Sequence, residues 1–265
     1  MTPESSGKWS DLWVRLGSGA LMVTIGLLAI WYGSGLFHAL VALVCGLMVW
    51  ELVKMLNPSS GWAPSALGAL AGAVTMASIY LPAGFALPIL LAVGLLGFSQ
   101  LQRHRTLFMV FTVMILMSGY GLMQVRDDLG FTWLLWIVLV VVVTDVVGYF
   151  AGRAIGGPKF WPRVSPKKTW SGTAAGWVGA AIVGWLFDLN TGAGPQIIGV
   201  SVAMSMASQM GDMAESALKR SRGIKDSSAL IPGHGGLLDR FDGMLGASVF
   251  LLLAGQFTGF PFGAG

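Results

Sequence analysis

Residues 136–150 read WIVLVVVVTDVVGYF, an apolar stretch interrupted by one carboxylate, Asp145. They belong to a longer apolar run, 131–150, and a helix needs about 20 such residues to cross a bilayer. The run lacks the strict alternation of a strand, so it predicts a membrane-spanning helix. A carboxylate inside a bilayer costs at least about 2.5–3.5 kcal/mol, which favours an Asp145 that faces a cavity or a partner. The alternative is an acid hydrogen-bonded near the helix end, where Arg153 follows two turns later.

The rest of the 265-residue chain has the same character, with 55% hydrophobic and only 11% charged residues. A soluble domain carries roughly 25% charged residues, so this composition excludes a water-soluble globule. The single cysteine, Cys45, excludes a disulfide framework and a CxxC metal site. We predict an all-α, polytopic integral membrane protein with about nine transmembrane helices. The predicted spans are residues 16–32, 37–56, 64–80, 84–101, 107–123, 131–150, 173–187, 195–218 and 243–260.

The positions of the basic residues predict the orientation of these helices. With a cytoplasmic N-terminus, fifteen of the sixteen Lys and Arg residues, from Lys8 to Arg240, fall on the cytoplasmic side and only Arg126 on the other. The pI of about 9.4 therefore reflects membrane orientation and not nucleic-acid binding. We expect a bacterial-type cytoplasmic (inner) membrane protein whose chemistry faces the cytoplasm.

The sequence divides into two predicted regions of one membrane domain. Residues 1–130 form about five spans, and residues 131–265 form about four spans with two cytoplasmic loops. The first loop is GRAIGGPKFWPRVSPKKTWSG, residues 152–172. The second is SALKRSRGIKDSSALIPGHGGLLDRFDG, residues 216–243, where charge is concentrated. We expect both loops to belong to the active site.

Acidic side chains also recur on the eighth predicted helix. Asp212 and Glu215 are one turn apart and belong to a polar stripe at spacings of three and four. Two acids on one face suit a hard cation, although such a stripe can also serve helix–helix packing. The stripe comprises Ser205, Ser208, Gln209, Asp212, Glu215, Ser216 and Lys219.

The loops supply groups of both signs. Asp226, Asp239 and Asp242 alternate with basic residues, and Lys167 and Lys168 come from the other loop. Mg²⁺ binds through one or two carboxylates and substrate phosphates, while Lys and Arg bind the remaining phosphate oxygens. These residues therefore predict a polyphosphate–metal site beside the lipid. The glycines around His234 would let the backbone approach a phosphate closely, and His234 itself either holds the loop or contacts substrate.

The second loop resembles the signature of the phosphatidate cytidylyltransferase (CDP-diacylglycerol synthase) family. That signature reads S-x-hydrophobic-K-R, four residues, K-D, a small residue, a proline, H-G-G and D-R-hydrophobic-D. The matching residues here are Ser216, Lys219, Arg220, Lys225, Asp226, Ser228, Pro232, His234, Gly235, Gly236, Asp239, Arg240 and Asp242.

The first loop is similar to a second region of the same family, through Asp145, Tyr149, Gly152 and SPKKTW at 165–170. Two positions depart from the pattern: Gly148 replaces the commoner Ala, and Ser171 replaces the usual Glu and removes a carboxylate. The resemblance covers about residues 140–243, whereas residues 1–130 match only as membrane helices.

The resemblance implies a membrane enzyme that converts CTP and phosphatidate into CDP-diacylglycerol and pyrophosphate with Mg²⁺, often as a homodimer. It implies a metal centre at Asp212 and Asp239 that holds Mg²⁺ and a second cation, K⁺ or Mg²⁺, and we add Asp145 as a ligand or a neighbour of the ligands. We expect Asp212, Asp239, Lys219 and Arg240 to be catalytic. The expected substrate-binding residues are Lys167, Lys168, Lys219, Arg220, Lys225, His234, Gly235, Gly236 and Arg240.

Two other functions remain open at the level of sequence. A CTP-dependent polyprenol or phytol kinase would use the same nucleotide but release CDP. An ion-coupled transporter would explain Asp145 and Asp212 as intramembrane ion sites, but not the charged loops. A structural scaffold is the least favoured, because it gains nothing from buried carboxylates.

Overall fold

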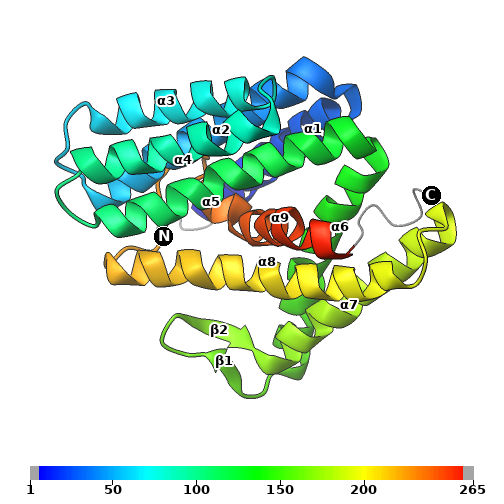
Figure 1. Cartoon of the computed structure of the whole chain (residues 1–265). Helices are drawn as coiled ribbons and strands as arrows, with labels where there is room; N and C mark the ends of the chain where they lie inside the picture. The colour runs from blue at the N-terminus through cyan, green and yellow to red at the C-terminus, as the bar shows by residue number, and fades with distance from the viewer. Residues whose placement is uncertain (1–5, 259–265) are drawn as a thin grey trace, which may run out of the picture. The chain divides into compact units, whose positions relative to one another are not determined.

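The computed structural model describes the backbone of residues 6–258 and the side chains of residues 13–255, residue 83 excepted, so that the side chain of Lys8 lies outside the described part. Over this range the chain forms nine α-helices, a short π-helix and one hairpin (Figure 1). Each predicted span corresponds to one helix. The helices are α1 Ser6–Tyr32, α2 Ser34–Leu56, α3 Ala63–Ser78, α4 Ala83–Gln100, α5 Arg105–Gln124, α6 Phe131–Ile155, α7 Trp170–Thr191, α8 Gln196–Ser221 and α9 Leu238–Thr258, and the π-helix η1 is Val125–Leu129.

Five of these helices are long and apolar enough to cross a membrane: the part of α1 from Trp13, α2, α5 together with η1, α6 and α7. The apolar helix α3 and the segment Gly84–Gln100 of α4 are shorter, and the polar stripe lowers the apolarity of α8. The structure therefore agrees with a largely helical membrane protein. Nine membrane crossings and a cytoplasmic N-terminus stay predictions.

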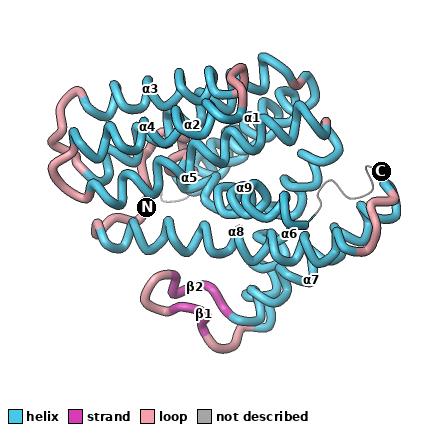
Figure 2. Tube along the Cα trace, viewed as in Figure 1, coloured by secondary structure: helices cyan, strands magenta, loops and turns pink. Residues whose placement is uncertain are grey.

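The first charged loop is more ordered than the sequence predicted, because it contains a small antiparallel hairpin (Figure 2). Strand β1, Lys159–Trp161, pairs with β2, Ser165–Thr169, through Lys159 opposite Thr169. Thr169 then caps α7, since its Oγ1 accepts a hydrogen bond from the Gly172 amide at 3.2 Å. The hairpin thus fixes Lys167 and Lys168 directly before the helix begins.

The described chain forms two compact units. Unit 1 comprises Met1–Thr112 and Ile224–Arg240, and unit 2 comprises Val113–Gly223 and Phe241–Gly265. The loop 224–240 packs with the N-terminal helices of unit 1, and the two regions predicted from sequence, 1–130 and 131–265, stay predictions.

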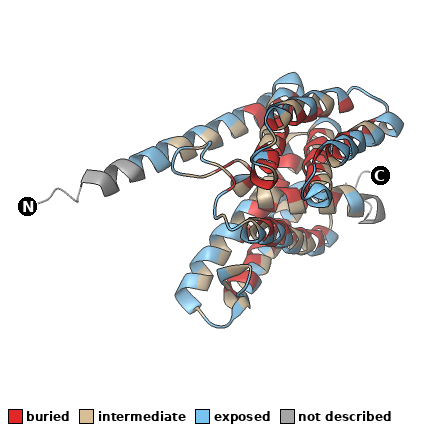
Figure 3. Ribbon diagram, turned by 90° about the vertical axis from the view of Figure 1, so that its left-hand side faces the viewer, coloured by how far each residue is buried: buried red, intermediate tan, exposed pale blue. Residues whose placement is uncertain are grey.

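Unit 1 is built around α2, which is buried along much of its length, whereas the described part of α1 is mostly exposed (Figure 3). The side chains of Val49 and Leu52 are fully buried. Helix α3 approaches α2 very closely, because a Cβ on Gly46 would lie 2.8 Å from the Gly68 carbonyl oxygen. Small residues at this crossing permit contact between the two backbones.

Unit 2 places α6 beside α7 and α8. Buried Trp136 of α6 donates through Nε1 to Ser201 Oγ of α8 at 2.9 Å. About two turns farther along α6, Thr144 Oγ1 donates to Ser205 Oγ at 2.8 Å. These polar contacts fix how far α6 slides along α8, and therefore where Asp145 stands relative to the polar stripe.

Candidate active site

A cavity of about 390 Å³ lies in unit 2. It is lined by the C-terminal end of α6, which is predicted to face the cytoplasm, by the hairpin and by the start of α7. Basic residues dominate its charged lining, and Asp145 is its one acid among the described residues. Gly148, Gly152 and Gly172 let the backbones of α6 and α7 approach each other closely beside the cavity. The lining comprises Thr144, Asp145, Gly148, Tyr149, Gly152, Arg153, Lys159, Lys167, Lys168, Thr169, Gly172, Thr173 and Gln209.

Asp145 lines this cavity and is exposed to it, as expected of a carboxylate in an apolar run. Arg153 lines the same cavity but donates to the Tyr149 hydroxyl at 3.0 Å. Lys168, which also lines the cavity, forms an ion pair through its ammonium group with the Asp212 carboxylate of α8. The structure therefore brings together the first charged loop and the polar stripe, which are far apart in the sequence.

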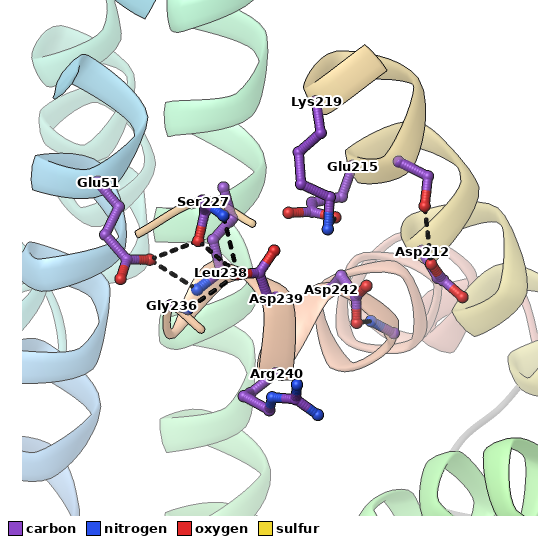
Figure 4. Close-up of polar contacts among 12 residues, drawn as sticks. Glu51, Asp212, Glu215, Lys219, Ser227, Gly236, Leu238, Asp239, Arg240 and Asp242 are labelled. Carbon is purple, nitrogen blue, oxygen red and sulfur yellow. Dashed lines mark hydrogen bonds and ion pairs between the residues drawn. The ribbon is translucent and has the colours of Figure 1, made fainter. Parts of the chain in front are cut away.

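A second ion pair lies farther along α8, between Glu215 and Lys219 (Figure 4). Glu215 is almost completely buried, with a side chain only 1% exposed. Asp242 belongs to the same part of unit 2: burial, followed by the charges of Asp212 and Asp145, raises the pKa of the Asp242 carboxyl above its usual range. The main cause is burial, which disfavours the charged form of the carboxyl group.

The donor chemistry of unit 2 fits a hard cation, since Asp145, Asp212 and Asp242 are close enough for their charges to interact and offer only oxygen ligands. Among the described residues, however, no group of three or more His, Cys, Asp and Glu side chains is arranged to hold a metal ion. Mg²⁺ needs only one or two carboxylates and takes its other ligands from water and phosphate. The unit therefore fits a Mg²⁺ ion that arrives with its substrate.

The second charged loop belongs to unit 1 as far as Arg240, and it folds into a tight turn around His234. The Ile231 amide donates to Gly235 O at 2.8 Å, and the His234 amide donates to Ile231 O at 2.9 Å. Gly233 and Gly235 have φ values of 74° and 83°, which favour glycine. Arg240 closes the turn, because its Nε and a terminal guanidinium nitrogen both donate to His234 O, at 2.9 and 2.7 Å.

Asp239 organises the base of this loop. Its Oδ2 accepts hydrogen bonds from the Ser227 amide at 2.9 Å, the Ser227 hydroxyl at 3.0 Å and the Gly236 amide at 2.8 Å (Figure 4). Asp239 and Asp242 are three residues apart in α9. Asp239 accepts hydrogen bonds from the loop of unit 1, whereas the charges of Asp212 and Asp145 in unit 2 act on Asp242. Metal binding by Asp239 stays a prediction.

Two residues of the N-terminal helices contact this loop and were missed from the sequence. Ser18 of α1 lies 2.8 Å from His234 Nδ1 and donates to Pro232 O at 2.9 Å. This contact ties His234 and its loop to α1, and substrate binding by His234, its other expected role, stays a prediction. Glu51 of α2 accepts four hydrogen bonds from the loop. The sequence did contain a signal for Glu51, because a carboxylate in the apolar run 37–56 carries the same free-energy cost of membrane insertion as Asp145.

The structure thus places the predicted site residues in two sets. Unit 2 holds Asp145, Lys167, Lys168, Asp212, Lys219 and Arg220, and unit 1 holds Lys225, His234, Gly235, Gly236, Asp239 and Arg240. Within unit 2, Lys168 and Asp212 are in contact while Lys167 and Arg220 are exposed. Within unit 1, His234, Gly236, Asp239 and Arg240 form one hydrogen-bonded loop, on which Lys225 is exposed.

Comparison with known proteins identifies the family of this chain. The profile of the cytidylyltransferase family matches residues 13–258, which is nearly the whole chain. The chain belongs to the cytidylyltransferase family. The matched range includes both charged loops and most of the N-terminal helices.

Several curated relatives of this cytidylyltransferase family member are named phosphatidate cytidylyltransferase. The protein from Brucella abortus (strain 2308) is 47% identical over 149 residues, 54% of this chain and 55% of the relative. The protein from Bacillus subtilis is 41% identical over 128 residues, 47% of this chain and 48% of the relative, and that from Haemophilus influenzae is 42% identical over 128 residues, 46% and 44%. The chain thus spans about half the length of the curated relatives it matches.

Proposed function

We propose that this protein is a phosphatidate cytidylyltransferase, which transfers CMP from CTP to phosphatidate. A phosphate oxygen of phosphatidate forms a bond to the α-phosphorus of CTP, and the bond from that phosphorus to the α,β-bridging oxygen breaks. The products are CDP-diacylglycerol and pyrophosphate. Family membership and the names of the relatives support a cytidylyl transfer, and the lipid substrate is inferred from those names.

The observation that carries the proposal is the charged cavity of unit 2. Arg153, Lys159, Lys167 and Lys168 line it together with Asp145, and Asp212 pairs with Lys168 beside it. Four cationic groups around one cavity suit a polyphosphate, which binds through its oxygens to Lys and Arg. The cavity volume, about 390 Å³, is within the range of small-ligand sites.

The chemical difficulty is electrostatic, because one phosphate anion must attack another highly charged phosphate. The phosphate of phosphatidate is already a nucleophile at neutral pH, so no strong general base is required. Positioning and charge neutralisation should therefore supply most of the catalysis. Lys167 and Lys168 would hold the triphosphate, and Lys159 and Arg153 would receive the phosphate of the lipid.

Asp212 and Asp145 would hold Mg²⁺, with Asp242 beside them. The ion would supply positive charge at the α-phosphate and the departing pyrophosphate. Lys168 would exchange its partner when the nucleotide binds, releasing Asp212 and binding a phosphate oxygen. In the same proposal, Asp239 is a further metal ligand, and the site holds a second cation, K⁺ or Mg²⁺. The predicted substrate contacts of Lys219, Arg220, Lys225, His234, Gly235, Gly236 and Arg240 are part of it as well.

Membrane insertion supports the same function, because phosphatidate keeps its acyl chains in the bilayer. We propose an inner-membrane protein with a cytoplasmic N-terminus, so that the cavity opens at the headgroup level where CTP is available. The two charged loops then contribute positive charge at the surface of an anionic leaflet. We also propose a homodimer, which chemical crosslinking in native membranes would test.

The decisive experiment measures product formation by detergent-purified protein supplied with CTP, with and without phosphatidate, across Mg²⁺ concentrations. We expect pyrophosphate release that requires both phosphatidate and Mg²⁺, together with transfer of cytidine-labelled nucleotide into a chloroform-soluble product. Release of CDP in place of pyrophosphate would identify a lipid kinase. Ion flux in proteoliposomes without any CTP turnover would identify a transporter. Either result overturns the proposal.

A further inference from the structure

Glu51 is a carboxylate of α2 that lies in an apolar, membrane-length helix and is completely buried. It belongs to the N-terminal half, which carries none of the predicted site residues. Its two oxygens nevertheless accept hydrogen bonds from four groups of the loop 224–240. We propose that Glu51 is a positioning residue for cytidylyl transfer, which sets the conformation of this loop; the inference rests on the function proposed above.

The four donors come from both ends of the His234 turn, and Figure 4 shows one from each end, Ser227 and Leu238. On one side, the Ser228 hydroxyl donates to Glu51 Oε1 at 2.5 Å, and the Ser227 hydroxyl lies 3.2 Å from Oε2. On the other side, the Leu237 amide donates to Oε1 at 3.0 Å and the Leu238 amide to Oε2 at 2.8 Å. One carboxylate therefore ties together the two chain segments that enter and leave the turn.

The last two donors are amides at the start of α9. The first amides of a helix have no partner within the helix, and a negative group beside them is favourable. Glu51 thus caps α9 from another helix and fixes where α9 begins. Since Asp239 and Arg240 are the second and third residues of α9, Glu51 determines their positions as well.

The loop is shaped to receive this carboxylate. A Cβ on Gly236 would lie 2.5 Å from Glu51 Oε1 and would overlap the Ser227 hydroxyl, so only glycine fits at this position. Ser227 is shared, because its hydroxyl is 3.0 Å from Asp239 Oδ2 as well as 3.2 Å from Glu51 Oε2. Glu51, Ser227 and Asp239 form one continuous network, in which a change at Glu51 reaches Asp239.

Glu51→Gln tests the proposal, because glutamine keeps the shape but replaces one acceptor oxygen by an NH₂ group that faces donors. Groups that orient the ligands of an active site typically change activity by about 10–100-fold when replaced. We expect kcat for pyrophosphate release to fall by about that factor, with the KM for CTP changed less than about threefold. The control is Ser78→Ala in α3, which removes a buried hydroxyl that bonds only within its own helix.

Two further measurements separate positioning from simple destabilisation. Ser228→Ala removes one donor without disturbing α2, and it should lower kcat less than Glu51→Gln. In the double variant, kcat should fall by less than the product of the two single fold-changes, since both residues act through one network. Trypsin cleavage after Lys225 should accelerate in Glu51→Gln relative to wild type and Ser78→Ala, because the loop is released.

The outcomes are distinct. Wild-type kcat in both Glu51→Gln and Ser228→Ala would overturn the inference. Faster cleavage of the loop with unchanged kcat would overturn it too, since the contact would then hold the loop without serving the reaction. If the wild-type protein shows no CTP turnover, the proposed function fails, whereas the cleavage assay still reports whether Glu51 fixes the loop.

Discussion

Lys168 and Asp212 form an ion pair that joins the hairpin before α7 to the polar stripe of α8. Both side chains are about one quarter exposed, 27% and 25%, so that solvent and ligands reach the pair. The pair places a cationic group on the carboxylate that is the leading candidate metal ligand. The positive charge of Lys168 therefore balances the negative charge of Asp212 within unit 2.

Asp212→Asn should lower kcat for pyrophosphate release by at least about 10²–10³-fold, the usual cost of removing one preorganised charge-stabilising group. The amide keeps the size of the side chain, so the protein should still fold and insert. Purified protein assayed at saturating CTP and phosphatidate gives the rate, and gel filtration in detergent checks folding. Near-normal turnover would show that Asp212 holds no essential cation.

Lys168→Gln should weaken CTP binding more than Lys167→Gln does. Lys168 is paired and half-buried, and a charged hydrogen bond is worth about 1.5–3 kcal/mol, or roughly 10–100-fold in the KM for CTP. Lys167 is exposed, and an exposed charge contributes at most about 1 kcal/mol, or roughly fivefold. Equal effects of the two substitutions would contradict the assignment of Lys168 to the triphosphate.

Asp239→Asn should also lower kcat by at least about 10²-fold. Unlike Asp212, which belongs to unit 2, Asp239 belongs to unit 1. The amide replaces an acceptor that receives two backbone amides and a hydroxyl, so the loop around His234 should loosen as well. Trypsin cleavage after Lys225 distinguishes the two variants, since only Asp239→Asn should accelerate it. Wild-type turnover of Asp239→Asn would remove Asp239 from the metal hypothesis, and wild-type trypsin cleavage would remove it from the loop hypothesis.

Gly246→Ala should destabilise unit 2, because a Cβ at this position of α9 would overlap the Ala207 carbonyl oxygen of α8. Overpacking of this kind costs about 1–3 kcal/mol in the free energy of unfolding. Gly199→Ala is the matched control, as it lies in α8 with nothing within 4 Å of the added Cβ. Thermal unfolding in detergent should show a lower midpoint for Gly246→Ala alone, and equal midpoints would contradict the close α8–α9 contact.

The predicted orientation can be tested with cysteine substitutions. Cys45 is buried and should not react, so Lys225→Cys and Arg126→Cys each introduce one reactive thiol. A membrane-impermeant maleimide should label Lys225→Cys in inverted vesicles and Arg126→Cys in right-side-out vesicles. Labelling of both positions from the same side would overturn the positive-inside assignment.

Local sequence patterns predicted the helices well, because each helix depends on neighbouring residues. The run 131–150 became α6, and the polar stripe of residues 205–219 stayed within α8. The β-hairpin was not predicted, since SPKKT has little strand propensity and depends on pairing with Lys159–Trp161. Strand pairing between segments leaves no periodic signal in either one.

The sequence by itself determined that this chain is a helical membrane protein with acids where lipid would penalise them, because length, apolarity and charge are local properties. It also supplied the signature residues of both charged loops. Only the tertiary structure decided which of these groups meet: Lys168 with Asp212 in unit 2, and Glu51 with the loop 224–240 in unit 1. Such pairings join residues that are far apart in the chain, and they are set by how helices pack, which no short stretch of sequence encodes.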